Sequence, residues 1–155
     1  MKVYLVQHGE AKAESEDPQR GLTPQGENEI RRVAGRAGQM GLKPAKIFHS
    51  GKLRAEQTAT IIGEALGLPG EATQGLAPMD EVRFWADKIN QSEEDLMLVG
   101  HLPHMEKLTS LLITGNENLR PLLFRSGAIN CLEEKEDRKW AVRWILTPEM
   151  ASSLP

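Results

Sequence analysis

Close to its start the chain reads Lys2-Val-Tyr-Leu-Val-Gln7, and His8 and Gly9 follow directly. This segment is short, mostly apolar and contains two valines, a pattern typical of a strand that is buried on both faces of a parallel sheet. Gly9 then interrupts the pattern. We therefore expect the first strand over residues 2–7, with His8 at its carboxyl end.

Two further segments have the same character, Ala45–His49 and Asp95–Val99, and the second has the composition of a central strand. Between the predicted strands, apolar residues recur at the spacing of an α-helix. The segment Pro24–Met40 is predicted to be such a helix, because Thr23 is typical of an N-cap and Gly41 of a helix end. Strands and helices therefore alternate along the first part of the chain.

The rest of the chain continues this alternation. Further helices are predicted from Ser50-Gly51 to Gly67, over Asp80–Gln91 and from Pro103 to Thr114, with room for a weak strand in Glu71–Pro78 and a terminal hairpin formed by Ala128–Leu132 and Trp140–Leu146. Such a sequence predicts the α/β class, as a single-domain three-layer α/β/α sandwich with a largely parallel central sheet. We expect one domain over residues 1–148 and a loose tail over residues 149–155.

The composition and net charge limit the kinds of partner and of cellular compartment that we expect. The 155 residues carry a formal net charge of -3 and a sequence pI of about 5.8, so nothing in the overall charge favours nucleic acid. No run of about 18 apolar residues exists that could span a bilayer, and the opening apolar segment is too short for a secretory signal. We therefore expect a cytoplasmic protein. Cys131 is the single cysteine, so no internal disulfide is expected.

Polar side chains follow three of the predicted strands. His8 and His101 come directly after the first and the central strand, and Arg54 lies in the first turns of the helix after the second strand. In open α/β sheets the carboxyl ends of parallel strands meet at one edge, where the binding site lies. The three side chains would form a cationic pocket that suits a phosphoryl group, whose oxygens need hydrogen-bond donors throughout transfer.

Four short motifs occur in order along this framework. They are His8-Gly9-Glu10, Leu22-Thr-Pro-Gln-Gly26, Arg54-Ala-Glu-Gln-Thr58 and Gly100-His101. Together they resemble the motifs of the histidine phosphatase superfamily, which has a phosphoglycerate mutase-like fold. The chain also lacks the length for the insert that roofs the site in members acting on sugar phosphates. It is thus similar to the SixA-like phosphohistidine phosphatases, whose sites are open.

The resemblance implies a role for each site residue. His8 is the implied nucleophile, which forms a phosphohistidine intermediate, while His101 and Arg54 bind the phosphoryl oxygens. The implied phosphate-binding set is completed by Gln7, Gly9, Arg20 and Leu102. Neither a metal nor another cofactor is expected, because protein cations take the place that magnesium has in other phosphoryl-transfer sites. His49 and His104 are interpreted as structural residues.

Two features depart from the family pattern. In the family, the residue before the nucleophile is normally arginine, and here it is Gln7. The charged guanidinium group of arginine is thus replaced by an amide with two neutral donors. We expect this exchange to lower the activity about tenfold to a hundredfold. Arg20 or Lys52 would supply compensating charge. Family members that act on sugar phosphates use a carboxylate as general acid. In this chain Asp80 and Glu81 are candidates for that role by their position in the sequence alone. A phosphohistidine substrate has less need of one, because its P–N bond is labile.

The sequence leaves three functions open. The first is a metal-independent protein phosphohistidine phosphatase, whose partner is a phosphohistidine-bearing phosphotransfer protein. The second is a phosphatase of a small phosphate ester. The third is a module that binds phosphohistidine without turning it over, because Gln7 stands in place of arginine.

Overall fold

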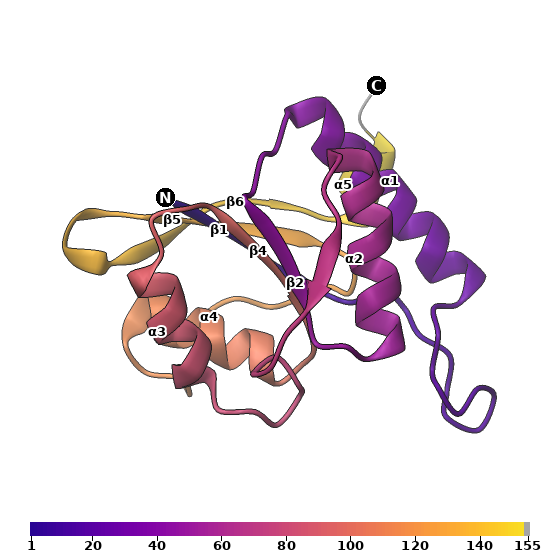
Figure 1. Ribbon diagram of the computed structural model, residues 1–155, viewed down its shortest axis with the longest axis horizontal. Helices are drawn as coiled ribbons and strands as arrows, with labels where there is room; N and C mark the ends of the chain where they lie inside the picture. The colour runs from indigo at the N-terminus through magenta and orange to yellow at the C-terminus, as the bar shows by residue number, and fades with distance from the viewer. Residues whose placement is uncertain (154–155) are drawn as a thin grey trace.

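The computed structural model describes residues 1–153 and forms, within them, a six-stranded sheet with helices on both faces (Figure 1). The strand order is β3-β2-β4-β1-β5-β6. The strands are β1 (Lys2–Gln7), β2 (Lys46–His49), β3 (Gly70–Ala72), β4 (Leu96–Gly100), β5 (Ile129–Glu134) and β6 (Trp140–Leu146). The first four are parallel, and β5 and β6 add an antiparallel hairpin beside β1. The predicted three-layer α/β/α sandwich is confirmed.

The helices divide between the two faces of the sheet. They are α1 (Pro24–Met40), α2 (Leu53–Leu66), α3 (Val82–Gln91), α4 (His104–Thr114) and α5 (Pro148–Ser153), with a 3₁₀ turn at Glu136–Arg138 in the hairpin. Residues of α1 and α2 belong to one buried apolar cluster, and residues of α3 and α4 to another. In Figure 1 the two helix pairs accordingly lie on opposite sides of the strands.

The side chains of β1 explain why one short strand can organise two cores. Val3 and Leu5 pack into the cluster with α3 and α4, whereas Tyr4 and Val6 pack into the cluster with α1 and α2. This follows from the two-residue period of a strand. An apolar side chain is therefore required on each face, as expected from the unbroken apolar pattern.

Helix α1 begins and ends where the sequence predicts. The hydroxyl of Thr23 accepts a hydrogen bond from the Gly26 N–H at 2.9 Å, and Pro24 occupies the first turn. Gly41 ends the helix with a φ of 72°, a left-handed conformation that glycine adopts at little cost.

The end of the chain differs from the prediction. Residues 149–153 do not form a loose tail, because Pro148–Ser153 is the helix α5, which packs beside α1. Glu149 of this helix bonds Arg125, which also bonds Glu29 of α1. Residues 154–155 of the predicted tail lie outside the described residues. Within residues 1–153, no helix has both the length and the apolar character needed to cross a membrane.

Candidate active site

His8 leaves the carboxyl end of β1 in a fixed orientation. Its backbone N–H donates to the carbonyl of Gly100 at 3.0 Å, which continues the pairing of β1 with β4. The ring Nδ1 lies 2.7 Å from the carbonyl oxygen of Gly9, so this nitrogen carries the proton and donates it. The other ring nitrogen, Nε2, therefore holds a lone pair, as a nucleophile requires.

The surroundings keep the imidazole of His8 neutral. Burial lowers the pKa of His8 to about 4, and the positive charges of Arg54 and Arg20 act in the same direction. The hydrogen bond to Gly9 opposes them but is the smaller influence. At neutral pH the lone pair of Nε2 is thus available without a separate base.

His101 comes from β4 and faces His8, as the topology predicts. The two ring centroids lie 5.0 Å apart, and the His101 residue is only 1% exposed. Burial, followed by the charges of His8 and Arg54, lowers the pKa of His101 to about 3. Its Nδ1 is buried and has no hydrogen-bond partner within residues 1–153. A buried polar atom without a partner is uncommon in a folded protein and calls for an explanation.

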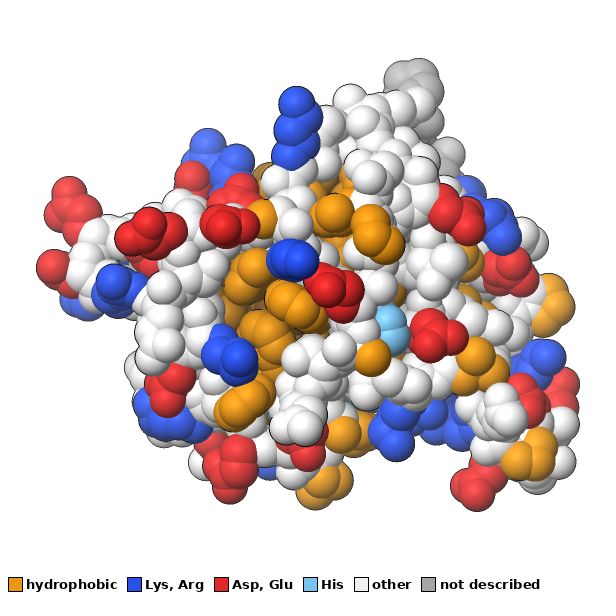
Figure 2. Space-filling view, viewed as in Figure 1, with side chains coloured by type: hydrophobic (Ala, Val, Ile, Leu, Met, Phe, Trp, Pro, Cys, Tyr) orange, Lys and Arg blue, Asp and Glu red, His pale blue; other side chains and the backbone are white. Residues whose placement is uncertain are grey.

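Two arginines complete the cationic side of the site. Arg54 lies in the first turn of α2, and its Nε is buried without a partner in the described part of the chain. Burial and then the charge of Arg20 lower the pKa of Arg54. Arg20 is held by a hydrogen bond from its Nε to the carbonyl of Lys12 at 3.0 Å. A group of Lys and Arg side chains is visible at the lower right of the face shown in Figure 2.

The third motif ties the site loops together. Thr58 Oγ1 accepts from the backbone N–H of Gly9 at 3.0 Å and donates to the carbonyl of Arg54 at 2.8 Å. Gln57 Oε1 accepts from the N–H of Leu22 at 2.7 Å and so holds the loop that carries Arg20. From the sequence, no role of their own was predicted for Gln57 and Thr58. Their hydrogen bonds fix the loops that carry His8, Arg54 and Arg20 relative to one another.

The remaining predicted phosphate ligands differ in what they offer. The N–H of Gly9 donates to Thr58 and its carbonyl accepts from His8, so Gly9 orients the ring of His8 and has no free N–H left for phosphate. Gln7 ends β1, and its Oε1 is buried without a partner in residues 1–153. Leu102 packs against the apolar cluster under α4, and its role as a ligand stays a prediction.

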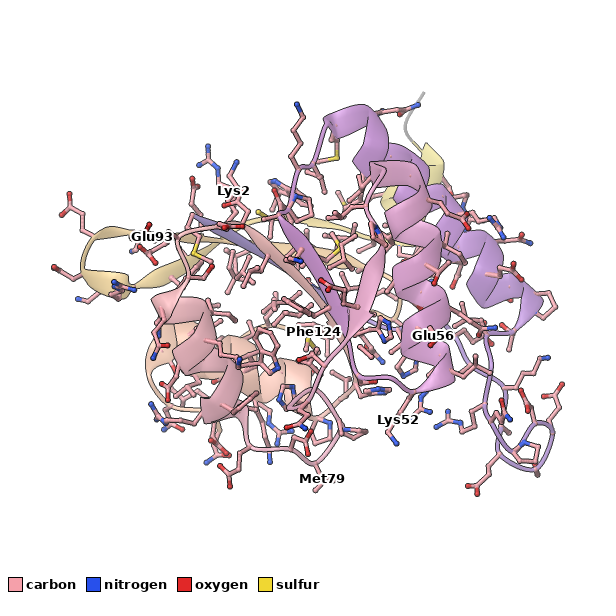
Figure 3. The ribbon with its side chains drawn as sticks, viewed as in Figure 1. Lys2, Lys52, Glu56, Met79, Glu93 and Phe124 are labelled. Carbon is pink, nitrogen blue, oxygen red and sulfur yellow. The ribbon has the colours of Figure 1, made fainter. Side chains whose placement is uncertain are left out.

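The two candidate acids make no hydrogen bond or ion pair with His8 or His101 within residues 1–153. Asp80 and Glu81 are exposed and line a cavity of about 530 Å³ together with Ser50 and Phe84. The carboxylate of Asp80 accepts a hydrogen bond from the N–H of Ala77 at 2.9 Å. In Figure 3, Met79, which directly precedes Asp80, lies at the same lower edge as Lys52. The cavity thus opens at the edge where the parallel strands end.

Sequence reasoning missed Ser50 as a site residue. Its hydroxyl oxygen lies 2.6 Å from Nε2 of His101, in the loop between β2 and α2. The available signal was its position directly after the second strand, at the same sheet edge as the histidines. The two histidines interpreted as structural, His49 and His104, are both buried, and Nδ1 of His49 accepts from the N–H of Gly51.

Known proteins are similar over nearly the whole chain. The sequence profile of the histidine phosphatase superfamily (branch 1) matches residues 3–84. Phosphohistidine phosphatase SixA of Escherichia coli (strain K12) is 27% identical over 155 residues, which cover 96% of this chain and 94% of that protein. An uncharacterized protein of Picosynechococcus sp. is 34% identical over 137 residues, which cover 83% of either chain.

The structural similarity is equally extensive. The structure of the protein histidine phosphatase SixA complexed with tungstate has a TM-score of 0.84 and 26% identity, and the match covers 96% of this chain and 97% of that chain.

Proposed function

The chain belongs to the histidine phosphatase superfamily, and from this premise we propose that it removes phosphoryl groups from phosphohistidine side chains of a phosphotransfer protein. The observation that carries the proposal is the state of His8, a neutral imidazole whose Nδ1 donates to the carbonyl of Gly9 and whose Nε2 therefore holds a lone pair. The similarity to phosphohistidine phosphatase SixA over nearly the whole chain supports the substrate class.

The reaction proceeds in two displacements. In the first, Nε2 of His8 attacks phosphorus, the P–N bond of the substrate breaks, and the leaving imidazole nitrogen takes a proton from solvent. In the second, water attacks the phosphohistidine at His8, the new P–N bond breaks, and inorganic phosphate departs. His8 returns as the neutral ring that began the cycle. Splitting one difficult step into two easier ones is the general advantage of covalent catalysis.

The cationic groups stabilise the phosphoryl oxygens in both steps. Arg54 and Arg20 supply charged donors, and Nδ1 of His101 supplies a neutral donor from a ring that is 1% exposed. These groups are fixed by the fold before the substrate arrives, so little reorganisation accompanies the redistribution of charge. None of these roles requires a metal ion.

The position of the carboxylates supports phosphohistidine over an ester. An alkoxide leaving group needs a proton from a general acid, whereas the imidazole of phosphohistidine leaves more readily. Asp80 and Glu81 make no hydrogen bond or ion pair with His8 or His101 in the described residues, and the carboxylate of Asp80 accepts from the N–H of Ala77. Their cavity nonetheless includes Ser50, so an ester phosphatase that uses one of these acids is the second candidate.

The experiment compares two substrates under chelating conditions. We expect the wild type to release phosphate from a phosphohistidine-bearing phosphotransfer protein at least tenfold more efficiently, in kcat/KM, than from small phosphate esters. Asp80→Asn and Glu81→Gln should leave that protein activity within about threefold. A preference for the ester that is lost in either variant would contradict the proposal. Binding of the phosphorylated protein without turnover would point instead to a binding module.

A further inference from the structure

We propose that Ser50 is a positioning residue, which holds the neutral ring of His101 in the tautomer that carries its proton on Nδ1. The inference rests on the proposed function, because it concerns the donor that His101 offers to the phosphoryl group. Its basis is the contact between the Ser50 hydroxyl oxygen and Nε2 of His101, at 2.6 Å.

The contact between Ser50 and His101 permits two assignments of its proton. A serine hydroxyl has one proton to donate and two lone pairs to accept with. The backbone N–H of Lys52 donates to Ser50 Oγ at 3.3 Å, which occupies one of the lone pairs. Within residues 1–153 the remaining partner of Ser50 Oγ is Nε2 of His101. The second lone pair or the hydroxyl proton can meet Nε2. Because a phosphoryl oxygen needs the single N–H of the neutral ring on Nδ1, we assign the hydroxyl as the donor and the lone pair of Nε2 as the acceptor.

The opposite ring nitrogen then carries the proton. Nδ1 of His101 is buried and has no partner in the described residues, so its N–H is left for a ligand. With the pKa of His101 lowered to about 3, the ring is neutral at neutral pH and has a single N–H to offer. In the other tautomer the same position would present a lone pair to a phosphoryl oxygen, and the two would repel each other. Which nitrogen bears the proton is set by the bond that the other one makes.

The backbone on both sides keeps Ser50 in place. His49, the preceding residue, pairs with Val99 in the parallel ladder of β2 and β4, two residues before His101. Lys52, two residues later, is the N-cap of α2, the helix that carries Arg54. The hydroxyl of Ser50 thus contacts His101 and also the backbone at the start of α2, the helix that carries Arg54.

The first part of the test reads the tautomer directly. ¹⁵N NMR of the histidine side chains at neutral pH should show His101 protonated on Nδ1 in the wild type and in Ser50→Thr, which keeps the hydroxyl. In Ser50→Ala the spectrum should shift toward a mixture of tautomers. A wild-type ring protonated on Nε2 would overturn the inference, whatever the activity of the protein.

The second part reads the consequence for catalysis. We expect Ser50→Ala to lower kcat on a phosphohistidine-bearing protein by about tenfold to a hundredfold, as is typical when a residue that orients a functional histidine is lost. Ser50→Thr should retain at least half of the wild-type rate, and Ser50→Ala should melt within a few degrees of the wild type. Unchanged kcat in Ser50→Ala would overturn the inference. A wild type that has no turnover would refute the proposed function alone, because the tautomer is still read by NMR.

Discussion

At the residue scale, Gln7 is where this chain departs from the pattern that its motifs otherwise follow. Its main chain lies in register opposite Gly100, and its carbonyl accepts from the N–H of Gly127. The side-chain Oε1 is buried without a partner in residues 1–153. A neutral amide at this place offers two donors but no charge.

Replacing Gln7 by arginine tests whether this departure limits the rate. We expect Gln7→Arg to raise kcat/KM about tenfold or more, because a charge-assisted hydrogen bond contributes about 1.5–3 kcal/mol against about 1 kcal/mol for a neutral one. The measurement is steady-state release of phosphate. Gln7→Lys serves as the control for charge without the planar fork. No gain in either variant would mean that Gln7 is not an impairment.

The buried histidines make the stability of the fold depend on pH. The pKa of His8 is lowered to about 4 and that of His101 to about 3, both mainly by burial, against about 6.5 in an unfolded chain. Below pH 6.5 the unfolded chain therefore binds more protons than the folded one. The free energy of unfolding must then fall as the pH decreases from about 6.5 toward 4.

Urea unfolding at a series of pH values checks this sign. Each histidine is expected to contribute up to about 1.4 kcal/mol per pH unit in that window. His8→Ala should show a shallower decline than the wild type. If the two proteins declined in parallel, the imidazole of His8 would titrate at its ordinary pKa and the account of its neutral state would be wrong.

At the element scale, the backbone at the start of α1 lies very close to the backbone of the loop after β1. A Cβ on Gly26 would collide with the carbonyl oxygen of Glu10 and would lie 2.9 Å from the Glu10 nitrogen. The same carbonyl accepts a hydrogen bond from the N–H of Thr23 at 3.0 Å. The glycine that ends the second motif is therefore required by a close approach of two backbones, two residues from His8.

Replacing each of two glycines of α1 by alanine distinguishes the effect of this close packing on stability from the effect of helix propensity. Gly26→Ala should destabilise the protein by about 1–3 kcal/mol, because backbone atoms cannot move aside as a flexible side chain can. Gly35→Ala meets nothing within 4 Å and should stabilise it by about 0.5–1 kcal/mol. Denaturant unfolding gives both values. Equal effects of the two substitutions would contradict the close approach.

Local features of the elements were predictable from sequence, and distant contacts were not. The bounds of β1 and α1 follow from apolar pattern, cap and breaker residues that lie next to one another. The contact of Ser50 with His101 joins residues 51 positions apart, and only the folded sheet brings them together. Helix α5 was missed because six residues are too few to show helical periodicity.

At the scale of the whole molecule, Arg125 connects helix α1 with helix α5. Its Nη2 lies 2.8 Å from Glu29 of α1 and 2.6 Å from Glu149 of α5. The side chain of Glu29 is only 8% exposed, whereas that of Glu149 is 62% exposed. The hydrogen bond from Arg125 lowers the pKa of Glu29, so the carboxylate of Glu29 is charged although it is buried.

The two carboxylates should respond differently when their charge partner is removed. Arg125→Met is expected to cost about 1–3 kcal/mol, because it leaves the charge of Glu29 buried without its cation. Glu149→Gln should cost less than about 1 kcal/mol, since its ion pair is exposed. Urea unfolding at pH 7 compares the two. A larger loss in Glu149→Gln would show that α5, and not the buried carboxylate, depends on Arg125.

The class and the family were predictable at this scale because they depend on the order of elements and motifs. The four motifs lie at strand ends or helix starts, and the family they indicated is confirmed. The division of roles among the site residues depends on hydrogen bonds that the order does not contain. One example is Gly9, whose N–H donates to Thr58 and whose carbonyl accepts from His8.

Trapping the phosphorylated chain tests the central claim most directly. Rapid quenching after mixing with a ³²P-labelled phosphohistidine-bearing protein, with metal chelated, should show label on His8 of the wild type before phosphate is released. His8→Ala should acquire no label and release no phosphate. Turnover that persists in His8→Ala, or label at another residue of the wild type, would contradict the assignment of His8 as the nucleophile.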